Sequence, residues 1–435
     1  MISVENKRAL KGALLLLVEV WFPYGSTEVC VRVPTANLLD IIEPRKTAPA
    51  KNPMMEIKNA LENPIGTKRL SEIVKAGDKV SLVLKDSSVS TNQMVISALV
   101  DELGSIGVRD EDITIIVAYD PLRAFSQHQR LPILGEELSA RLKVTRHKCN
   151  VDEESYLGKT SSEIEIYLNK LFAEADVKIL AGSVEPHPIA GYSGGYDLVL
   201  PGVASFDSIL EIFKLGIDGK VKQGNLEGNV IHEEMVEAVE LAKVDFTLNI
   251  VRDSGMDIVK AFAGDIHKVF EKSVKLTEEI YKVPVKNRAD IVFVSPGGIP
   301  FDSYLQEAIL CLESAFEIAK RGKAVALVAE CASGCGDKEF IEALSRFKKL
   351  NDLRRYLEKN FSISGLLAYR LMNLLQQINL MIVSAIPDYY ASRILGIKTA
   401  RTANEAFRML IEIVGSRGKA SFIPYGNLTV PFIET

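Results

Sequence analysis

His187 is the residue of this sequence that is best placed to do chemistry. It stands between two prolines, and Gly191, Gly194 and Gly195 follow within eight residues. Glycine lets a backbone approach a ligand closely, and an imidazole exchanges protons near neutral pH. A lone histidine often has only a structural role, and that alternative stays open. Its position in a glycine-rich loop favours a catalytic role for His187.

The same loop carries side chains that could contact a ligand. They are Tyr192, Ser193 and Asp197, and the backbone of Gly194 and Gly195 lies between them. By itself such a turn is a weak signal. The fingerprints of dinucleotide sites, phosphate-binding loops, zinc proteases and serine hydrolases do not occur in the sequence.

Polar residues also follow two other predicted strands. Asp86, Ser87 and Ser88 come after one of them, where their oxygens could cap the next helix or contact a ligand. Arg123 comes after the next one, and its planar guanidinium suits a carboxylate or a phosphate. A surface salt bridge would explain Arg123 equally well.

Short β-branched runs that alternate with helical patterns would position these loops. The predicted strands are 80–85, 113–119, 177–183, 246–251, 289–295, 323–330, 378–386 and 420–426. Nearly continuous apolar strands of this kind indicate an α/β fold with mainly parallel sheets that are covered on both faces. The loops after such strands gather at one edge, where α/β proteins bind ligands.

A proline and several charges near 280–288 mark a domain boundary. We expect two α/β domains, one at 1–284 and one at 285–435, that face each other across a cleft. The last segment could pack back on the N-terminal domain. Clefts between domains are common places for small-molecule sites.

The composition is that of a soluble globular protein. Of the 435 residues 47% are hydrophobic and 25% charged, with a net charge of −5 and no basic block, so we expect neither nucleic acid nor a membrane as a partner. The apolar run near the N-terminus is interrupted by Glu19 and is too short to span a bilayer, so it predicts a first strand. Five scattered cysteines favour the cytoplasm, and Cys331 with Cys335 does not suffice for a metal site.

Several long segments resemble the nickel-dependent lactate racemase (LarA-like) family. They include EPRKTAPAKNPMMEIKNALENPIG, VEPHPIAGYSGGYDLVLPGVASF and VPVKNRADIVFVSPGGIPFD, and the matches run in the family's order from about residue 20 to the C-terminal PYG. The resemblance implies a larger N-terminal domain and a smaller C-terminal α/β domain, with the active-site cleft between them. It implies a nickel-pincer nucleotide bound through a thioamide to a lysine. It also implies a histidine that ligates nickel, and two further histidines that act as bases on a 2-hydroxy acid.

Most of the residues that would do this are replaced here. The cofactor lysine falls on Asp197, the nickel-ligating histidine on Phe213 and one catalytic histidine on Leu122. An arginine falls on Val89, and a glutamine and a lysine fall on Glu307 and Leu310. The positions that match are Asp86, Arg123, His187, Ser193, Gly194 and Gly195.

The replacements argue against the family's cofactor. No thioamide can form on Asp197, and Phe213 cannot ligate nickel. If these positions line one cleft, they also remove cations and add carboxylates, which would repel a 2-hydroxy acid. We therefore expect no nickel-pincer nucleotide, and leave the cofactor open.

Three interpretations of the function remain. The first is a divergent member that binds a different small molecule or a cation in the cleft. Glu307 would then be a further ligand contact, and the weak metal candidates are Asp86, His187, Asp197 and Glu307. The second is a non-catalytic paralogue, which could form homo-oligomers or associate with a catalytic paralogue. The third is a true racemase or epimerase of 2-hydroxy acids, an isomerase whose cofactor is held differently.

Overall fold

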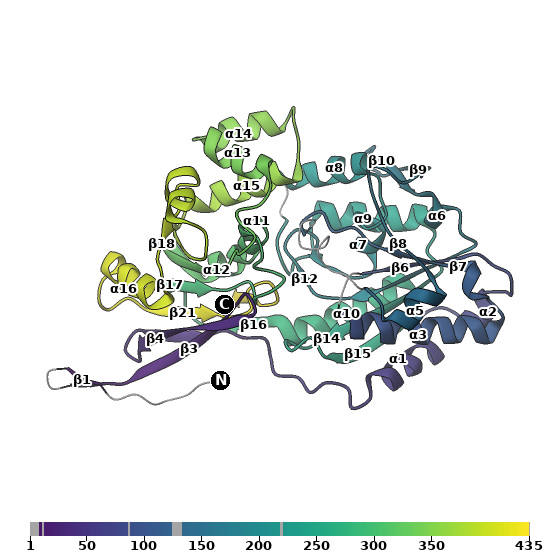
Figure 1. Cartoon of the computed structure of the whole chain (residues 1–435), viewed down its shortest axis with the longest axis horizontal. Coiled ribbons are helices and arrows are strands. Elements are labelled where there is room, and N and C mark those ends of the chain that lie inside the picture. The colour runs from purple at the N-terminus through teal and green to yellow at the C-terminus, as the bar shows by residue number, and fades with distance from the viewer. Residues whose placement is uncertain (1–7, 11–12, 86–87, 124–132, 218–220, 435) are drawn as a thin grey trace. The chain divides into compact units, whose positions relative to one another are not determined.

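The computed structural model describes residues 8–10, 13–85, 88–123, 133–217 and 221–434, and the chain forms two compact units (Figure 1). Unit 1 combines Met1–Arg45 with Tyr281–Thr435, and unit 2 is Lys46–Ile280. Both units are built on mainly parallel sheets, so the α/β fold expected from the sequence is confirmed.

The division of the chain differs from the expected boundary at 284, because the first 45 residues belong to unit 1. The reason is the apolar face of the first long strand. Phe22 is fully buried, and its ring lies 6.2 Å from that of Phe293 and 6.3 Å from that of Phe422. The last strand, β22 (Val430–Ile433), pairs with β16 (Lys282–Val285) and also lies in unit 1.

Unit 2 contains a six-stranded sheet in the order β15-β14-β11-β6-β7-β8. The strands are β6 (Val80–Leu84), β7 (Ile113–Val117), β8 (Lys143–Arg146), β11 (Val177–Ser183), β14 (Phe246–Arg252) and β15 (Ile258–Gly264). Only the β14–β15 pairing in this sheet is antiparallel. Two small hairpins accompany it: β9 (Glu154–Lys159) with β10 (Glu165–Asn169), and β12 (Pro186–His187) with β13 (Gly191–Tyr192).

Helices lie on both faces of this sheet, with α1 and α3 on one side and α7 and α9 on the other (Figure 1). The helices of unit 2 are α1 (Pro53–Glu62), α2 (Leu70–Ile73), α3 (Val89–Ile106), α5 (Glu136–Arg141), α6 (Lys170–Ala173), α7 (Tyr196–Val199), α8 (Phe206–Lys214), α9 (Val230–Ala242) and α10 (Ile266–Tyr281), with short 3-10 turns at Asp110–Asp112 and Leu215–Ile217.

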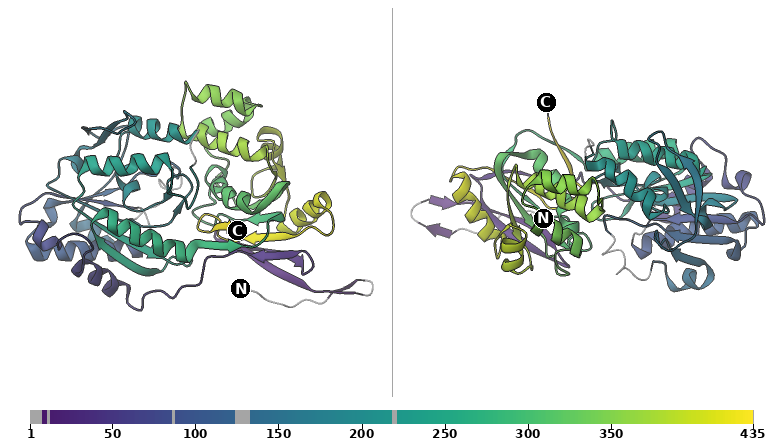
Figure 2. Two further views of the ribbon diagram at one scale, coloured as in Figure 1. Left: turned by 180° about the vertical axis from the view of Figure 1, so that it is seen from behind. Right: turned by 90° about the horizontal axis from the view of Figure 1, so that it is seen from above.

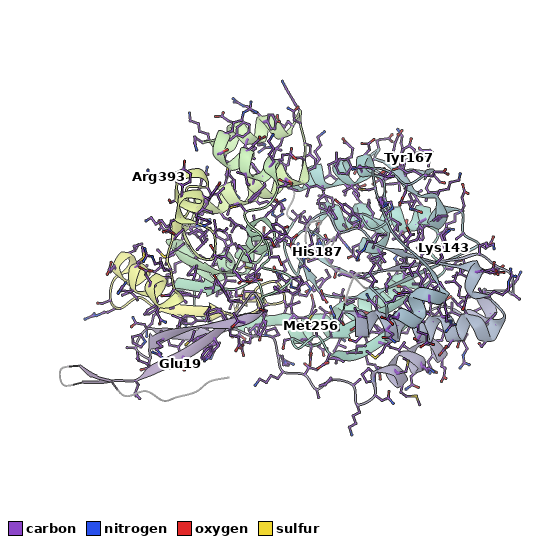
Figure 3. The ribbon with its side chains drawn as sticks, in the orientation of Figure 1. Glu19, Lys143, Tyr167, His187, Met256 and Arg393 are labelled. Atoms are coloured by element: carbon purple, nitrogen blue, oxygen red, sulfur yellow. The ribbon has the colours of Figure 1, made fainter. Side chains whose placement is uncertain are left out.

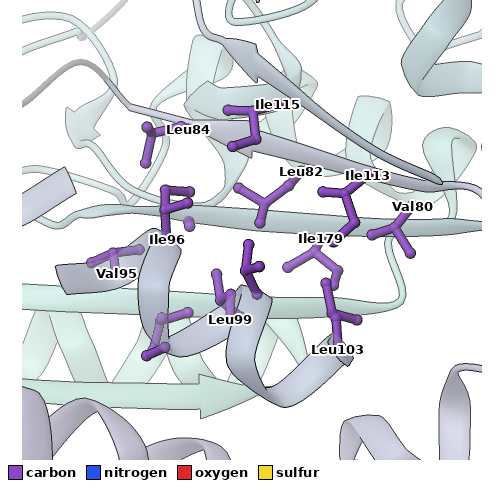
Figure 4. Close-up of a cluster of buried hydrophobic side chains, with 14 of the residues drawn as sticks. Val80, Leu82, Leu84, Val95, Ile96, Leu99, Leu103, Ile113, Ile115 and Ile179 are labelled. Atoms are coloured by element: carbon purple, nitrogen blue, oxygen red, sulfur yellow. The ribbon is translucent and has the colours of Figure 1, made fainter. Parts of the chain in front are cut away.

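The core of unit 2 decides which side chains of the sheet face α3. Leu82 and Leu84 of β6 pack with Leu99 of α3 and with Ile179 of β11 (Figure 4). Because side chains alternate along a strand, the residues between them face the opposite side of the sheet. Lys85, the residue after β6, therefore faces that opposite side.

Unit 1 contains a second six-stranded sheet, all parallel, in the order β20-β19-β18-β17-β21-β5. The strands are β5 (Leu38–Ile41), β17 (Ala289–Val294), β18 (Ala319–Val328), β19 (Asn379–Val383), β20 (Lys398–Thr399) and β21 (Ala420–Ile423). The helices are α11 (Leu305–Ala308), α12 (Leu312–Ile318), α13 (Lys338–Arg346), α14 (Leu350–Leu357), α15 (Ile363–Leu375) and α16 (Ala403–Val414), with a 3-10 turn at Ile309–Cys311 and a π-helical turn at Tyr389–Ile394.

Near the N-terminus, β1 (Arg8–Leu10) pairs with β2 (Ala13–Leu15), and β3 (Leu17–Tyr24) pairs with β4 (Thr27–Pro34). The predicted first strand is confirmed by β3. The purple β3–β4 ribbon lies beside the yellow helix α16 (Figure 2). Asn404 of α16 donates to the carbonyl of Cys30 in β4, although the two residues are 374 positions apart. Within the described ranges, no helix is long and apolar enough to cross a lipid bilayer.

Candidate functional site

The glycine-rich turn of unit 2, residues 191–195, is held at the carboxyl end of β11 by backbone and side-chain hydrogen bonds. After Ser183 the chain passes through Glu185 and the β12–β13 hairpin, and it returns at Ser193. There the Ser193 amide donates to the Glu185 carbonyl over 2.8 Å, and the Ser193 hydroxyl accepts from the Glu185 amide over 3.2 Å. The turn then leads directly into α7.

Two positions in this segment require glycine. At Gly191, with φ +81°, a Cβ would lie 2.2 Å from the backbone oxygen of Asn225. At Gly194, with φ +95°, a Cβ would lie 2.5 Å from a side-chain carbon of Val184. The backbone therefore packs closely against its neighbours on both sides of Ser193, which fixes the position of the serine hydroxyl.

Lys85 brings a cation to this turn, and it was not among the residues singled out from the sequence. Its Nζ donates to the Ser193 hydroxyl over 2.5 Å and lies 3.8 Å from Oδ2 of Asp197. The stem crosses Gly182 of β11, where an added Cβ would lie 3.0 Å from the Lys85 Cβ. The sequence signal for Lys85 would have been a glycine beside it on the neighbouring strand. That neighbour can be identified only when the register of the two strands is known.

Asp197 is engaged within the turn. Its Oδ1 accepts from the Gly194 amide over 2.6 Å, and its Oδ2 faces Lys85. Burial raises the pKa of Asp197, while Lys85 and the Gly194 amide act in the opposite direction and lower it. The carboxylate thus has a dedicated hydrogen-bond donor and a dedicated cation.

The negative charge of Glu185 is stabilised by three cationic side chains. Burial would raise its pKa, but Arg252, Lys85 and Arg123 outweigh burial and hold the pKa well below its usual value. Arg252 is itself 3% exposed and makes an ion pair with Glu185. Lys85 and Arg252 place two cations beside these carboxylates, and neither belonged to the replaced positions considered in the sequence.

His187 lies on β12 (Figure 3), and two backbone amides donate to its ring. Nδ1 accepts from the Ala190 amide over 2.9 Å and from the Ile189 amide over 3.3 Å. An Nδ1 that accepts two hydrogen bonds carries no proton, so the neutral ring has its proton on Nε2. His187 in this state is a hydrogen-bond donor at Nε2, and it cannot ligate a metal or accept a proton there.

The other predicted contacts have different surroundings. Ser88 caps α3 by accepting from the Thr91 amide over 3.3 Å, which confirms the capping interpretation for this residue. Asp86 and Ser87 lie outside the described residues. Tyr192 is 2% exposed, and its hydroxyl donates to Glu278 of α10 over 3.0 Å. Arg123 is half-buried and acts on Glu185 electrostatically.

The residues that the resemblance places at replaced family positions are mostly buried. Leu122 and Phe213 are 3% and 1% exposed, and both are surrounded by packed side chains. Val89 is the first residue of α3. Glu307 and Leu310 are buried in unit 1, whereas the turn belongs to unit 2.

These residues do not fit the nickel-pincer nucleotide. The carboxylate of Asp197 interacts with the Gly194 amide and with Lys85, and it offers no amine for a thioamide. Phe213 of α8 is buried and has no side-chain nitrogen that could ligate nickel. In the part of the chain that the structure describes, no three His, Cys, Asp or Glu side chains gather in a way that could hold a metal ion.

Comparisons with known proteins show likeness over nearly the whole chain. The family models "Lactate racemase N-terminal domain" and "Lactate racemase C-terminal domain" match residues 24–223 and 285–430. The lactate racemase of Thermoanaerobacterium thermosaccharolyticum is 28% identical over 423 residues, which are 94% of this chain and 98% of the relative. That of Lactiplantibacillus plantarum is 26% identical over 424 residues, or 94% and 99%.

A solved structure gives the same result for the fold. The lactate racemase apoprotein from Thermoanaerobacterium thermosaccharolyticum superposes with a TM-score of 0.85 at 27% sequence identity. The match covers 95% of this chain and 99% of that one. The resemblance expected from the sequence segments is confirmed.

Proposed function

This chain belongs to the lactate racemase family, and from that premise we propose that it binds a small oxygen-bearing molecule in unit 2 without using the nickel-pincer nucleotide. One observation carries the proposal. The ammonium of Lys85 donates to the Ser193 hydroxyl beside Asp197, so the residue after β6 supplies the cation of the turn. The carboxylate of Asp197 lies at the position where the resemblance places the family's cofactor lysine.

The donors of the site suggest the class of ligand. Lys85 and Arg252 are cationic, and the Nε2 proton of His187 is a further donor. Oxygen acceptors, such as a carboxylate, a carbonyl or a hydroxyl group, complement donors of this kind. Relatives of the chain are named lactate racemases, so small 2-hydroxy acids are the first ligands to test. We propose His187 as a donor to the ligand, and any turnover would be that of an isomerase.

A cation is the weaker choice of ligand. Asp197 and His187 were two of the candidates for binding a metal, but Asp197 already faces Lys85 and His187 presents a proton at Nε2. A divalent ion would have to displace the Lys85 ammonium. Thermal shifts with Mg²⁺, Mn²⁺ and Zn²⁺ test this alternative, and a saturable shift lost in Asp197→Asn would favour it.

Two measurements test the proposal. Intact-mass spectrometry and nickel analysis of protein purified without a tag should give the mass of the chain alone and no nickel. Isothermal titration with lactate and related oxyacids should then show binding that is lost in Lys85→Met and kept in Lys260→Met, a surface lysine of the same sheet. A nucleotide adduct on any lysine would overturn the proposal and favour the family reaction with a relocated anchor.

A second candidate is a non-catalytic paralogue that associates with a catalytic one. The observation in its favour is that Leu122 and Phe213 are ordinary buried core residues at former catalytic and ligating positions. Co-purification with a catalytic paralogue would support it, and turnover by the isolated chain that disappears in His187→Ala would exclude it. A homo-oligomer remains a prediction, as does a cytoplasmic location, which fits five cysteines that are all free.

A further inference from the structure

Helix α10 is the element through which the chain passes from unit 2 back into unit 1. All of α10 belongs to unit 2 except its last residue, Tyr281, where unit 1 resumes. Strand β16 begins at the next residue, so no loop separates the helix from the strand. β16 in turn pairs in parallel with β22, the last strand of the chain. A change in the position of α10 therefore acts directly on this pair of strands.

The first turns of α10 contact the end of the glycine-rich turn. A Cβ added at Gly195 would lie 3.6 Å from a side-chain carbon of Ile266, so Ile266 packs against the turn. The next residue of the helix is His267, and its Nδ1 forms a hydrogen bond with the Tyr196 hydroxyl over 2.8 Å. The ring of Tyr196 also lies 4.6 Å from that of Phe270. Tyr196 is 5% exposed, so this contact is buried.

The last turn of α10 contacts the beginning of the same segment. The Tyr192 hydroxyl donates to Oε1 of Glu278 over 3.0 Å, and Glu278 stands three residues before Tyr281. One residue earlier, the Thr277 hydroxyl lies 3.4 Å from the Val184 carbonyl. Tyr192 and Thr277 are 2% and 0% exposed. Each end of α10 thus receives one tyrosine hydroxyl from the segment of the glycine-rich turn.

The turn and α10 form one packed body. In an α-helix each amide bonds to the carbonyl four residues before it, so the helix resists bending between its two ends. The turn has no free space on the side of Gly194, where a Cβ would already clash with Val184. A displacement of the turn moves both tyrosine hydroxyls, and their partners on α10 must follow or lose a buried hydrogen bond.

We propose that α10 transmits changes at the glycine-rich turn to β16 and β22, so that the state of the turn regulates the local stability of unit 1. Energetic coupling needs a physical element that both places share. α10 contacts the turn segment through Tyr192 and Tyr196, which act as positioning residues, and it continues directly into β16. The inference goes beyond the proposed function, because it holds for any molecule that displaces the turn.

Tyr192→Phe tests the coupling without any ligand, because it removes only the hydroxyl that reaches Glu278. Native-state hydrogen exchange measures local opening strand by strand. In the variant the amides of β16 and β22 should exchange about two- to fivefold faster, since part of the free energy of one hydrogen bond reaches these strands. The amides of β18 and β19, in the same unit, should exchange as in the wild type, which separates coupling from a general loss of stability.

Tyr167→Phe is the matched control. The Tyr167 hydroxyl also donates to a glutamate of unit 2, Glu165, over 3.2 Å, but it does not contact α10. Exchange in unit 1 should be unchanged in this variant.

The opposite direction gives a second test, because coupling free energies are reciprocal. Val285→Ala in β16 should speed exchange of the Ser193 amide, which bonds to the Glu185 carbonyl in the segment of the turn. Val325→Ala in β18, a valine that is buried to a similar extent, should leave that amide unchanged.

Unchanged exchange of β16 and β22 in Tyr192→Phe, or equal acceleration throughout unit 1, would overturn the inference. If Val285→Ala fails to fold, the Tyr192→Phe comparison still decides. Lactate added to the wild-type protein links the inference to the ligand, and binding should slow exchange of β16 and β22. If lactate binds and these strands do not respond, only this inference fails. If lactate and related oxyacids do not bind, the proposed function fails, and the two variants decide the coupling by themselves.

Discussion

Lys85→Met should destabilise unit 2 at neutral pH, and the loss should shrink in acid. The variant keeps the stem that lies across Gly182 and removes the ammonium, which stands 3.8 Å from Asp197. Two unit charges at that distance interact by about 4 kcal/mol at an effective dielectric constant near 20. The side chains of Lys85 and Asp197 are 19% and 13% exposed, so solvent screens part of this interaction.

Ion pairs in other proteins set limits on the stability that Lys85→Met should lose. Breaking a buried pair costs about 3–5 kcal/mol, and exposed pairs contribute about 0–1 kcal/mol. For Lys85→Met we expect a loss of about 2–3 kcal/mol at pH 7, between these limits. The surface pair of Lys260 with Glu56 provides the control, and Lys260→Met should cost less than about 1 kcal/mol at every pH.

The pH dependence follows from the direction of the pKa shift. Burial raises the pKa of Asp197 in the folded protein, so its contribution to stability is complete below the pKa of the unfolded chain and is lost as pH rises through the folded pKa. Lys85 lowers that pKa, and without it the pKa rises further. The difference between wild type and Lys85→Met should therefore be greatest near pH 7 and decrease as pH falls toward 4.

Hydrogen exchange of the β6 and β11 amides between pH 5 and 8, with urea denaturation at lower pH, measures the difference. Asp197→Asn in the Lys85→Met background removes the stranded charge and should recover most of the loss, which would give a coupling energy of about 1–3 kcal/mol in the double-mutant cycle. A loss of equal size at pH 4 and pH 7, or strictly additive effects of the two substitutions, would refute the electrostatic explanation.

Three further predictions concern other parts of the structure. Gly194→Ala should cost about 2–4 kcal/mol in thermal unfolding because strain at positive φ adds to a clash, whereas Gly195→Ala, which has room, should cost about 1 kcal/mol. The ¹⁵N spectrum of His187 should show the proton on Nε2. In unit 1, Asp302→Asn should cost about 1–3 kcal/mol in urea unfolding, because the buried carboxylate accepts from the Gly25 amide over 2.7 Å.

Each of these has an outcome that contradicts it. Equal losses for the two glycine variants would show that the neighbours of Gly194 move aside. A proton on Nδ1 would return His187 to the role of a base through Nε2. Unchanged unfolding of Asp302→Asn would mean that a side-chain amide oxygen replaces the carboxylate fully, and Asp302→Leu would then be the stricter test.

The arrangement of the strands was predictable from the sequence because it depends on local patterns. Runs such as 80–85 and 177–183 are buried on both faces, and buried parallel strands read as continuous apolar segments. The division into units was not predictable in the same way. It depends on where β3 docks, and the contact of Phe22 with Phe293 joins residues 271 positions apart.

The candidate site was predictable only in part, for a related reason. The glycines and His187 stand close together in the chain, so composition alone points to them. Lys85 meets the turn through the register of β6 and β11, and register is set by tertiary pairing.

The buried charges bear on the choice between a ligand-binding protein and a degenerate one. Stability does not require them, because well-packed apolar residues in place of a buried ion pair are often neutral or stabilising. Leu122 and Phe213 are buried apolar residues at two positions where the resemblance places histidines. The pairs of Lys85 with Asp197 and of Arg252 with Glu185 show the opposite, and they lie at the strand ends where α/β proteins bind ligands. Buried charged groups at such a place are better explained by a ligand than by the needs of the fold. Lys85→Met is therefore the variant whose binding and stability most directly separate the two.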